Sequence, residues 1–218
     1  MIGIITYDCP HLKTAQIIER CKSKIKFIFT IPFKKRPIRD VLIDHRPYQF
    51  KGKTPQDLGK KYLIKVLPLI EIGDLDNHES IELIVCGAGI LPESIVNNYK
   101  VINAHPGLIP TTRGLDSFKW AIYYKEPMGI TIHQINSEVD LGILIHHSQT
   151  MVYRKDKIIE LSERHYRNEI NSLCEYIINP LHEKNIQILE TKEARMRMSL
   201  EKEKITLNRF NEFKENYA

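Results

Sequence analysis

The sequence predicts an α/β protein with a mostly parallel central sheet and a helical C-terminal extension. Short β-rich apolar runs alternate with amphipathic stretches through the first two thirds of the 218 residues, as in βαβ units. From residue 156 onward the pattern becomes helical. We therefore expect an α/β domain over residues 1–155 and a helical extension over residues 156–218 packed on it. A chain of this length can bury a core without disulfides or metals.

Apolar runs separated by turn residues predict six strands. They cover residues 2–7, 26–31, 81–89, 100–105, 128–135 and 142–151. A helix is expected to begin at Pro55, because Thr54 and Asp57 together are typical of a helix N-terminus. Further helices are predicted after Pro10, after Pro92, over 114–124, and from about 156 to 178. The ragged apolar face of residues 190–218 predicts a packed helix or a homodimer contact.

The segment between the second strand and this helix has a composition of its own. Residues 32–54 contain three prolines and few periodic apolar positions, which predicts a long surface excursion. Residues 32–61 carry nine Lys or Arg against three Asp. This cluster could contact nucleic acid, bind a phosphorylated small molecule or simply be solvated. The net charge of +5 does not by itself indicate nucleic-acid binding.

The remaining composition predicts a cytoplasmic protein. No apolar run approaches the roughly 20 residues that a membrane span needs, and the N-terminus lacks the basic region of a secretory signal. The four cysteines are scattered, which favours reduced thiols. Because there is no HExxH motif and no cluster of His and Cys, we expect no bound metal.

The stretch NAHPGLIP, residues 103–110, holds the candidate chemistry. Asn103 and His105 project to the same side of the predicted strand, at the edge of a parallel sheet where ligands bind. Histidine can move a proton near neutral pH, and an amide NH2 can stabilise an oxyanion. Further along, Asp140 could raise the pKa of the imidazole and accept a proton. These three groups suit the transfer of an acyl carbon to an amine, although each also has an ordinary structural interpretation.

Residues 83–150 resemble the catalytic core of the formyltransferases that use 10-formyltetrahydrofolate. The family pattern Asn-x-His-Pro-Ser-Leu-Leu-Pro, followed by Asp-x-Gly, is matched at residues 103–110 and 140–142, with Gly107 in place of the serine. The resemblance implies a Rossmann-like formyltransferase fold. It also implies that Asn103 and His105 stabilise a tetrahedral oxyanion, while Asp140 orients the imidazole and helps to carry the proton.

The same resemblance implies a binding site for the co-substrate 10-formyltetrahydrofolate. In this family the pterin is held by backbone groups on two walls. Here one wall would be formed by Ala88, Gly89 and Leu91, and the other by Glu138, Val139 and Asp140.

Residues outside the motif indicate which kind of amine would accept the formyl group. The sequence TTRGLDSFKWAI follows the motif where methionyl-tRNA formyltransferases have WRGAAPI, and TYDCPHLKT replaces the Gly- and Ser-rich phosphate loop of the glycinamide ribonucleotide branch. Residues 113–123 are more similar to sugar N-formyltransferases of bacterial surface polysaccharide synthesis. We therefore expect the acceptor to be a nucleotide-linked amino sugar, with no nucleic-acid or membrane partner. The alternatives are glycinamide ribonucleotide formylation, formyltetrahydrofolate hydrolysis, and a folate- or nucleotide-binding regulator without activity.

Overall fold

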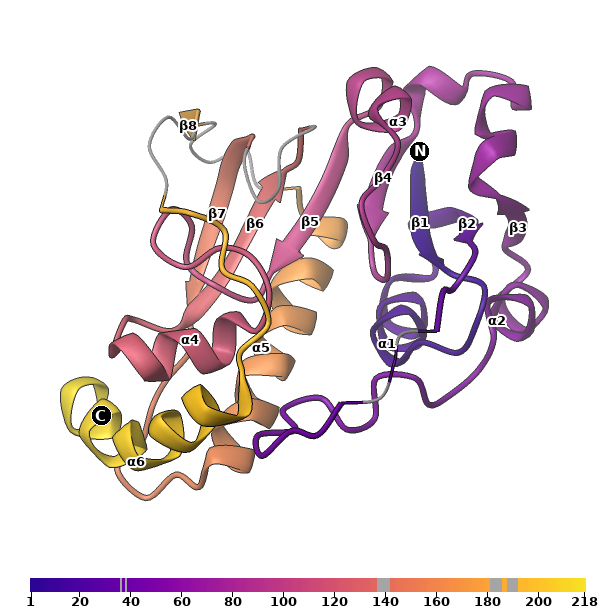
Figure 1. Ribbon diagram of the computed structural model, residues 1–218. Coiled ribbons are helices and arrows are strands. Elements are labelled where there is room, and N and C mark those ends of the chain that lie inside the picture. The colour runs from indigo at the N-terminus through magenta and orange to yellow at the C-terminus, as the bar shows by residue number, and fades with distance from the viewer. Residues whose placement is uncertain (36, 38, 137–141, 181–185, 188–191) are drawn as a thin grey trace.

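The computed structural model describes residues 1–35, 37, 39–136, 142–180, 186–187 and 192–218. Their strands form one sheet in the order β3-β2-β1-β4-β5-β6-β7-β8 (Figure 1). The pairs from β3 to β5 are parallel, and those from β5 to β8 are antiparallel. The predicted α/β class is thus confirmed. The strands are β1 (Ile2–Tyr7), β2 (Ile25–Ile31), β3 (Lys65–Pro68), β4 (Glu82–Val85), β5 (Val101–His105), β6 (Gly129–Gln134), β7 (Ile143–Gln149) and β8 (Ile186–Gln187).

Helices cover both faces of the sheet. The helices are α1 (Leu12–Cys21), α2 (Pro55–Tyr62), α3 (Glu93–Asn98), α4 (Ser117–Tyr124), α5 (Ile158–Ile178) and α6 (Leu200–Tyr217), with 3-10 turns η1 (Leu69–Asp74) and η2 (His78–Ser80). One core joins α1, α2 and α5 to strand residues such as Ile4 and Ile102. On the other face, α3 and η1 pack on Ile5 and Val101. Successive residues of β5 therefore face opposite layers.

Local signals explain where two of the helices begin. Asp57 N donates to Thr54 Oγ1 at 3.1 Å, and Asp57 Oδ2 accepts from Thr54 N at 3.1 Å, so the predicted capping at α2 is confirmed. By contrast, α4 begins three residues later than predicted. Gly114 (φ +90°) and Asp116 (φ +53°) have left-handed backbone conformations, which delay the first helical turn to Ser117.

The excursion over residues 32–54 is tied to the body of the protein. In Figure 1 it runs from β2 towards α5 and α6 and returns to α2. Leu42 N and Ile43 N both donate to Glu203 Oε2 of α6, at 2.6 and 3.1 Å. Glu203 is fully buried and also forms ion pairs with Lys119 (2.6 Å) and Arg39 (3.5 Å). At least part of the basic cluster therefore neutralises buried carboxylates.

The C-terminal helix α6 packs on α4. Phe210 and Phe213 share a core with Phe118 and Ile122 of α4. The apolar face that we noted in the sequence thus finds partners within the chain. Among the described residues, no helix combines the length and apolar character needed to cross a bilayer.

Candidate active site

The carboxyl end of β5 places Asn103 and His105 on one face of the sheet. Across the antiparallel pair with β6, His133 lies opposite Asn103 and Thr131 lies opposite His105. Directly opposite residues share a face, so these four polar side chains form one group. The prediction that Asn103 and His105 project to the same side is confirmed, because the intervening Ala104 packs in the core under α1 and α5.

The imidazole of His105 is buried and held in one orientation. Its Nε2 lies 3.0 Å from the carbonyl oxygen of Thr112 and 3.2 Å from Ser117 Oγ. The hydroxyl of Ser117 donates its proton to Gly114 O at 3.0 Å. Because a carbonyl can only accept, we assign the proton of the neutral ring to Nε2. In this tautomer Nδ1 carries the lone pair, which is the arrangement that a proton acceptor requires.

The amide of Asn103 is oriented by His133. Asn103 Nδ2 lies 3.3 Å from His133 Nε2, and the His133 ring is fully buried between the strands. One N–H of the NH2 group therefore points at His133. The second N–H is directed elsewhere and is suited to an oxyanion that develops at the end of β5. This contact makes His133 a supporting residue for the Asn103 amide.

The loop that follows β5 is fixed from both sides. Thr131 Oγ1 donates to Gly107 O at 2.6 Å and accepts from Ile109 N at 3.0 Å. From α5, His165 Nε2 lies 3.2 Å from Pro106 O. Such contacts hold a catalytic side chain in place by immobilising the backbone around it.

Gly107 has no room for a side chain. A Cβ at this position would lie 2.6 Å from Thr112 O and 2.8 Å from His105 Nε2. The glycine therefore permits the loop to fold back so that the Thr112 carbonyl reaches the imidazole. The serine that formyltransferases have at this position could not be added here without moving the loop.

Replacing Gly107 by serine is expected to lower turnover about tenfold to a hundredfold, because an ångström-scale displacement near His105 misaligns the reacting groups. The measurement is kcat together with KM for the formyl donor. Gly73→Ser is the control, since a Cβ at Gly73 meets no atom within 4 Å. Unchanged kcat in Gly107→Ser would show that the close approach of Thr112 to His105 is dispensable.

Only one of the two predicted folate walls lies in the part of the chain that the structure describes. Leu91 is buried in the core beneath α3, Ala88 is half-buried against the same core, and Gly89 is exposed. A Cβ at Gly89 would meet no atom within 4 Å, so neighbouring described residues do not require glycine there. The other wall (Glu138, Val139 and Asp140) lies outside the described residues, as does the predicted pairing of Asp140 with His105.

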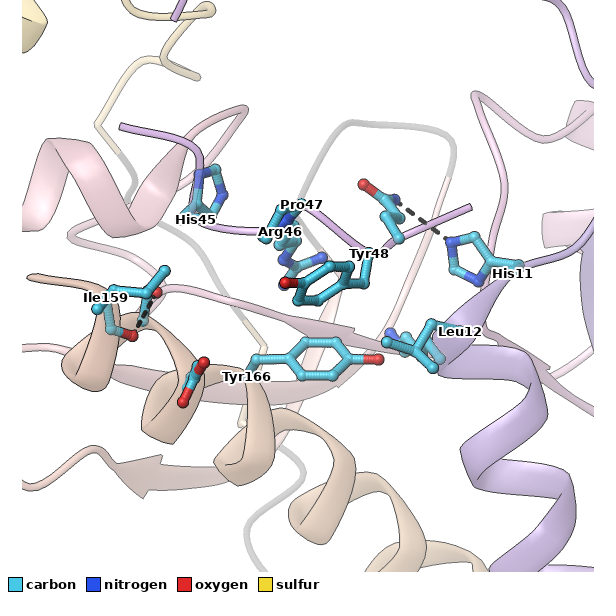
Figure 2. A pocket seen from close by; sticks show the side chains of 12 residues that line it. His11, Leu12, His45, Arg46, Pro47, Tyr48, Ile159 and Tyr166 are labelled. Atoms are coloured by element: carbon cyan, nitrogen blue, oxygen red, sulfur yellow. Dashed lines mark hydrogen bonds between the residues drawn. The ribbon is translucent and has the colours of Figure 1, made fainter. Parts of the chain in front are cut away.

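A pocket of about 140 Å³ opens between the start of α1, residues 45–49 and α5 (Figure 2). His11 lines it from α1, Arg46 and Tyr48 from the excursion, and Tyr166 from α5. Gln49 Nε2 lies 3.3 Å from His11 Nε2, which links the excursion to the start of α1. The wall formed by α5 continues to His165, which contacts the loop that follows β5.

Glu169 is a buried carboxylate behind this pocket. Lys13 Nζ lies 2.8 Å from Glu169 Oε1, and Arg46 pairs with Glu169 Oε2. Burial alone would raise the pKa of Glu169, but the charges of Arg46 and Lys13 lower it to about 2. The three groups hold α1, the excursion and α5 together, and they leave a net charge of one positive unit.

Stability is expected to fall as the pH drops from about 6.5 to about 4. Burial lowers the pKa of His11 and of His165 to about 4, from an ordinary value of 6.5. In this window the unfolded chain binds protons that the folded chain does not. Stability therefore declines by up to about 1.4 kcal/mol per pH unit for each histidine, and neither histidine has an effect above pH 6.5.

The measurement for this prediction is the free energy of unfolding by urea at pH 7 and pH 5. His165→Asn should reduce the difference between the two values, because one of the histidines with a lowered pKa is gone. Equal stability at both pH values for the unmodified chain would contradict the prediction.

Several side chains of this site were not predicted from the sequence. Thr112, Ser117 and His165 carry no motif, and they reach His105 or its loop only through the fold. Among the described residues, no group of three His, Cys, Asp or Glu side chains is placed to hold a metal ion.

Comparison with known proteins shows the family to which the chain belongs. Residues 69–177, half of the chain, match the model of the family described as formyl transferase. The chain is 31% identical over 98 residues to the phosphoribosylglycinamide formyltransferase of Haemophilus influenzae, which is 43% of this chain and 46% of that protein. It spans about half the length of the curated relatives that it matches.

Solved structures show the same fold. A sugar N-formyltransferase from Shewanella sp has a TM-score of 0.58 at 20% identity, covering 96% of this chain and 87% of that one. An N-formyltransferase from Helicobacter canadensis, solved with folinic acid and dTDP-3-aminofucose, has a TM-score of 0.62 at 18% identity, covering 96% and 80%. The matched half of the chain includes β5 with Asn103 and His105, and on this evidence the protein is a member of the formyl transferase family.

Proposed function

We propose that the protein is an N-formyltransferase that moves the formyl group of 10-formyltetrahydrofolate to the amine of a nucleotide-linked amino sugar. The observation that supports it most strongly is the oriented pair at the end of β5, where His133 fixes the amide of Asn103 and Thr112 fixes the ring of His105. Family membership favours formyl transfer. The sugar assignment draws on residues 113–123 and on similar structures that are sugar N-formyltransferases.

The proposed reaction uses three side chains. The acceptor amine attacks the formyl carbon, and the carbonyl oxygen of the formyl group becomes an oxyanion. Asn103 Nδ2–H stabilises this oxyanion, and the His105 ring does so once its Nδ1 has taken up the proton of the amine. A proton leaves the amine, passes to the His105–Asp140 pair and is delivered to N10 of the departing tetrahydrofolate as the N10–carbon bond breaks. The reaction needs no covalent enzyme intermediate, because bound reactants are held in contact.

The two substrates would approach from different elements. We propose that the pterin contacts the backbone at Ala88, Gly89 and Leu91 and, across from it, at residues 138–140. The acceptor would enter the pocket beside α1 and α5. At about 140 Å³ that pocket is smaller than the 300–1,000 Å³ typical of whole-ligand sites, so it would hold one part of the acceptor. The exposed Lys51 and Lys53 of the excursion would face the diphosphate.

The domain organisation follows the same proposal. Residues 1–155 would carry the groups named above, and residues 156–218 would form the helical extension. Helix α5 lies against α1 and β6, so the extension also supports the catalytic loop through His165.

Thermal-shift measurements with GDP-, UDP- and dTDP-linked amino sugars would identify the acceptor, since a ligand that binds the native state raises its apparent stability. Product analysis with 10-formyltetrahydrofolate then separates the activities. Formamide on the sugar supports the proposal. Formate released without an acceptor indicates a hydrolase, formylation of glycinamide ribonucleotide indicates the purine branch, and tight binding without turnover indicates a regulator. Each of these three outcomes rejects the sugar proposal.

A further inference from the structure

The segment 192–197, which precedes α6, lies directly against the loop that holds His105. Arg195 N donates to Arg113 O at 3.0 Å, and Leu115 N donates to Arg195 O at 2.7 Å. Between them, Gly114 has φ +90°, and a Cβ on it would collide with the backbone of Arg195. Residues more than 75 positions apart in the sequence are therefore paired backbone to backbone.

Two side chains of this segment, those of Lys192 and Arg195, bind the carboxylate of Glu126. Arg195 donates two parallel hydrogen bonds to the Glu126 carboxylate, at 2.7 and 2.9 Å, and Lys192 Nζ donates a third at 2.7 Å. Thr112 Oγ1 donates to the same carboxylate at 3.1 Å. Burial would raise the pKa of Glu126, but hydrogen bonds from Arg195 and Lys192 lower it below its ordinary range. The carboxylate is thus charged and fixed at neutral pH.

Thr112 connects this cluster to the active site. Its hydroxyl is bound by Glu126, and its carbonyl oxygen accepts the proton of His105 Nε2 at 3.0 Å. Because Thr112 is fully buried and anchored at its side chain, the direction of its carbonyl is fixed. A fixed acceptor at Nε2 keeps the neutral ring in the Nε2–H tautomer and Nδ1 in the basic form.

We propose that Arg195 is a positioning residue for formyl transfer, which acts through Glu126 and Thr112 to hold the tautomer and orientation of His105. The inference rests on the proposed role of His105 as the catalytic histidine. In this role Arg195 acts through Glu126 and Thr112 and needs no contact of its own with either substrate. The C-terminal segment is accordingly part of the catalytic apparatus and not only a structural cover. Arg195 binds Glu126 through two parallel hydrogen bonds, a geometry that lysine cannot reproduce fully.

Two pairs of variants separate positioning from general stabilisation. Arg195→Met removes the charge and both hydrogen bonds, whereas Arg195→Lys keeps the charge. Thr112→Val removes the hydroxyl at nearly constant shape, whereas Thr112→Ser keeps it. Arg209→Met is the matched control, because Arg209 also ties the C-terminal region to α4, by a 2.7 Å hydrogen bond to Tyr123 O, without contacting Thr112.

Two readouts are needed, kcat with KM for both substrates, and the ¹⁵N chemical shifts of the His105 ring in the full chain. For Arg195→Met and Thr112→Val we expect kcat to fall about tenfold or more with KM within about twofold, and the ring to become a mixture of tautomers. Arg195→Lys and Thr112→Ser should recover part of both properties. Arg209→Met should leave both unchanged.

Unchanged ring shifts and unchanged kcat in Arg195→Met and Thr112→Val would overturn the inference, as would a loss of kcat that the Arg209 variant shares. The ring shifts do not depend on activity. If the unmodified protein transfers no formyl group but Arg195→Met still alters the His105 tautomer, the proposed function fails while the structural coupling stands.

Discussion

Replacing His105 by glutamine is expected to lower the turnover number by about 10²- to 10⁴-fold, the usual contribution of a general acid–base group. Glutamine can still donate an N–H towards Thr112 O, but it has no basic nitrogen. The loop should therefore keep its shape while the proton acceptor is lost. The measurement is kcat for formyl transfer under saturating substrates, with the melting temperature as a check on folding.

The control for this variant is His78→Gln. His78 lies in η2 and bonds to Tyr99 Oη at 2.9 Å. Tyr99 precedes the amino end of β5, whereas His105 lies at its carboxyl end, so the turnover of this variant should be unchanged. Asp140→Asn should lose activity by a comparable factor, and the double variant with His105→Gln should lose little more, because residues that act as a unit are not additive. A His105→Gln protein that retains a tenth of normal turnover would remove His105 from the mechanism.

Replacing Glu169 by alanine is expected to lower the free energy of unfolding by about 3–5 kcal/mol, as is typical when one partner of a buried ion pair is removed. The side chain of Lys13 is only 7% exposed and would be left with a buried positive charge. Arg46 is 22% exposed and can turn towards solvent. The loss should therefore come mainly from Lys13, and it is measured by urea unfolding at pH 7.

Two further variants make this prediction specific. Glu212 pairs with Lys125 on the surface, where water screens the charges, so Glu212→Ala should leave the free energy of unfolding nearly unchanged. In the double variant Lys13→Met with Glu169→Leu, both charges are replaced by apolar groups, and much of the lost stability should return. A loss below about 1 kcal/mol in Glu169→Ala would mean that the buried charge is solvated in some other way.

The sequence was most informative where the determinants are local. Thr54, Pro55 and Asp57 predicted the start of α2, because capping depends on residues three positions apart. Strand β3 was missed because KVLP is short and ends in proline, and two-residue β8 has no periodicity to detect. The alternation of Asn103 and His105 along an apolar run was enough to place both on one face.

The parts of the site that escaped prediction depend on distant residues. His105 meets Thr112 and Ser117 because Gly107 lets the loop fold back. In the sequence, Gly107 was recognisable only as a departure from the serine of the formyltransferase pattern. Arg195 reaches Glu126 across 69 positions. Two basic residues of the excursion, Arg39 and Arg46, pair with Glu203 and Glu169, and no property of residues 32–61 alone predicts those carboxylates.

The most direct test of amino-sugar formylation follows the formyl carbon itself. 10-Formyltetrahydrofolate labelled with ¹³C in the formyl group is incubated with the protein and each nucleotide-linked amino sugar, and the labelled carbon is observed by NMR. Formylation of an amino sugar predicts a formamide resonance on one of these sugars, equal in amount to the tetrahydrofolate released and nearly absent with His105→Gln. Label that stays on the folate, or appears only as formate, with every such sugar would contradict it.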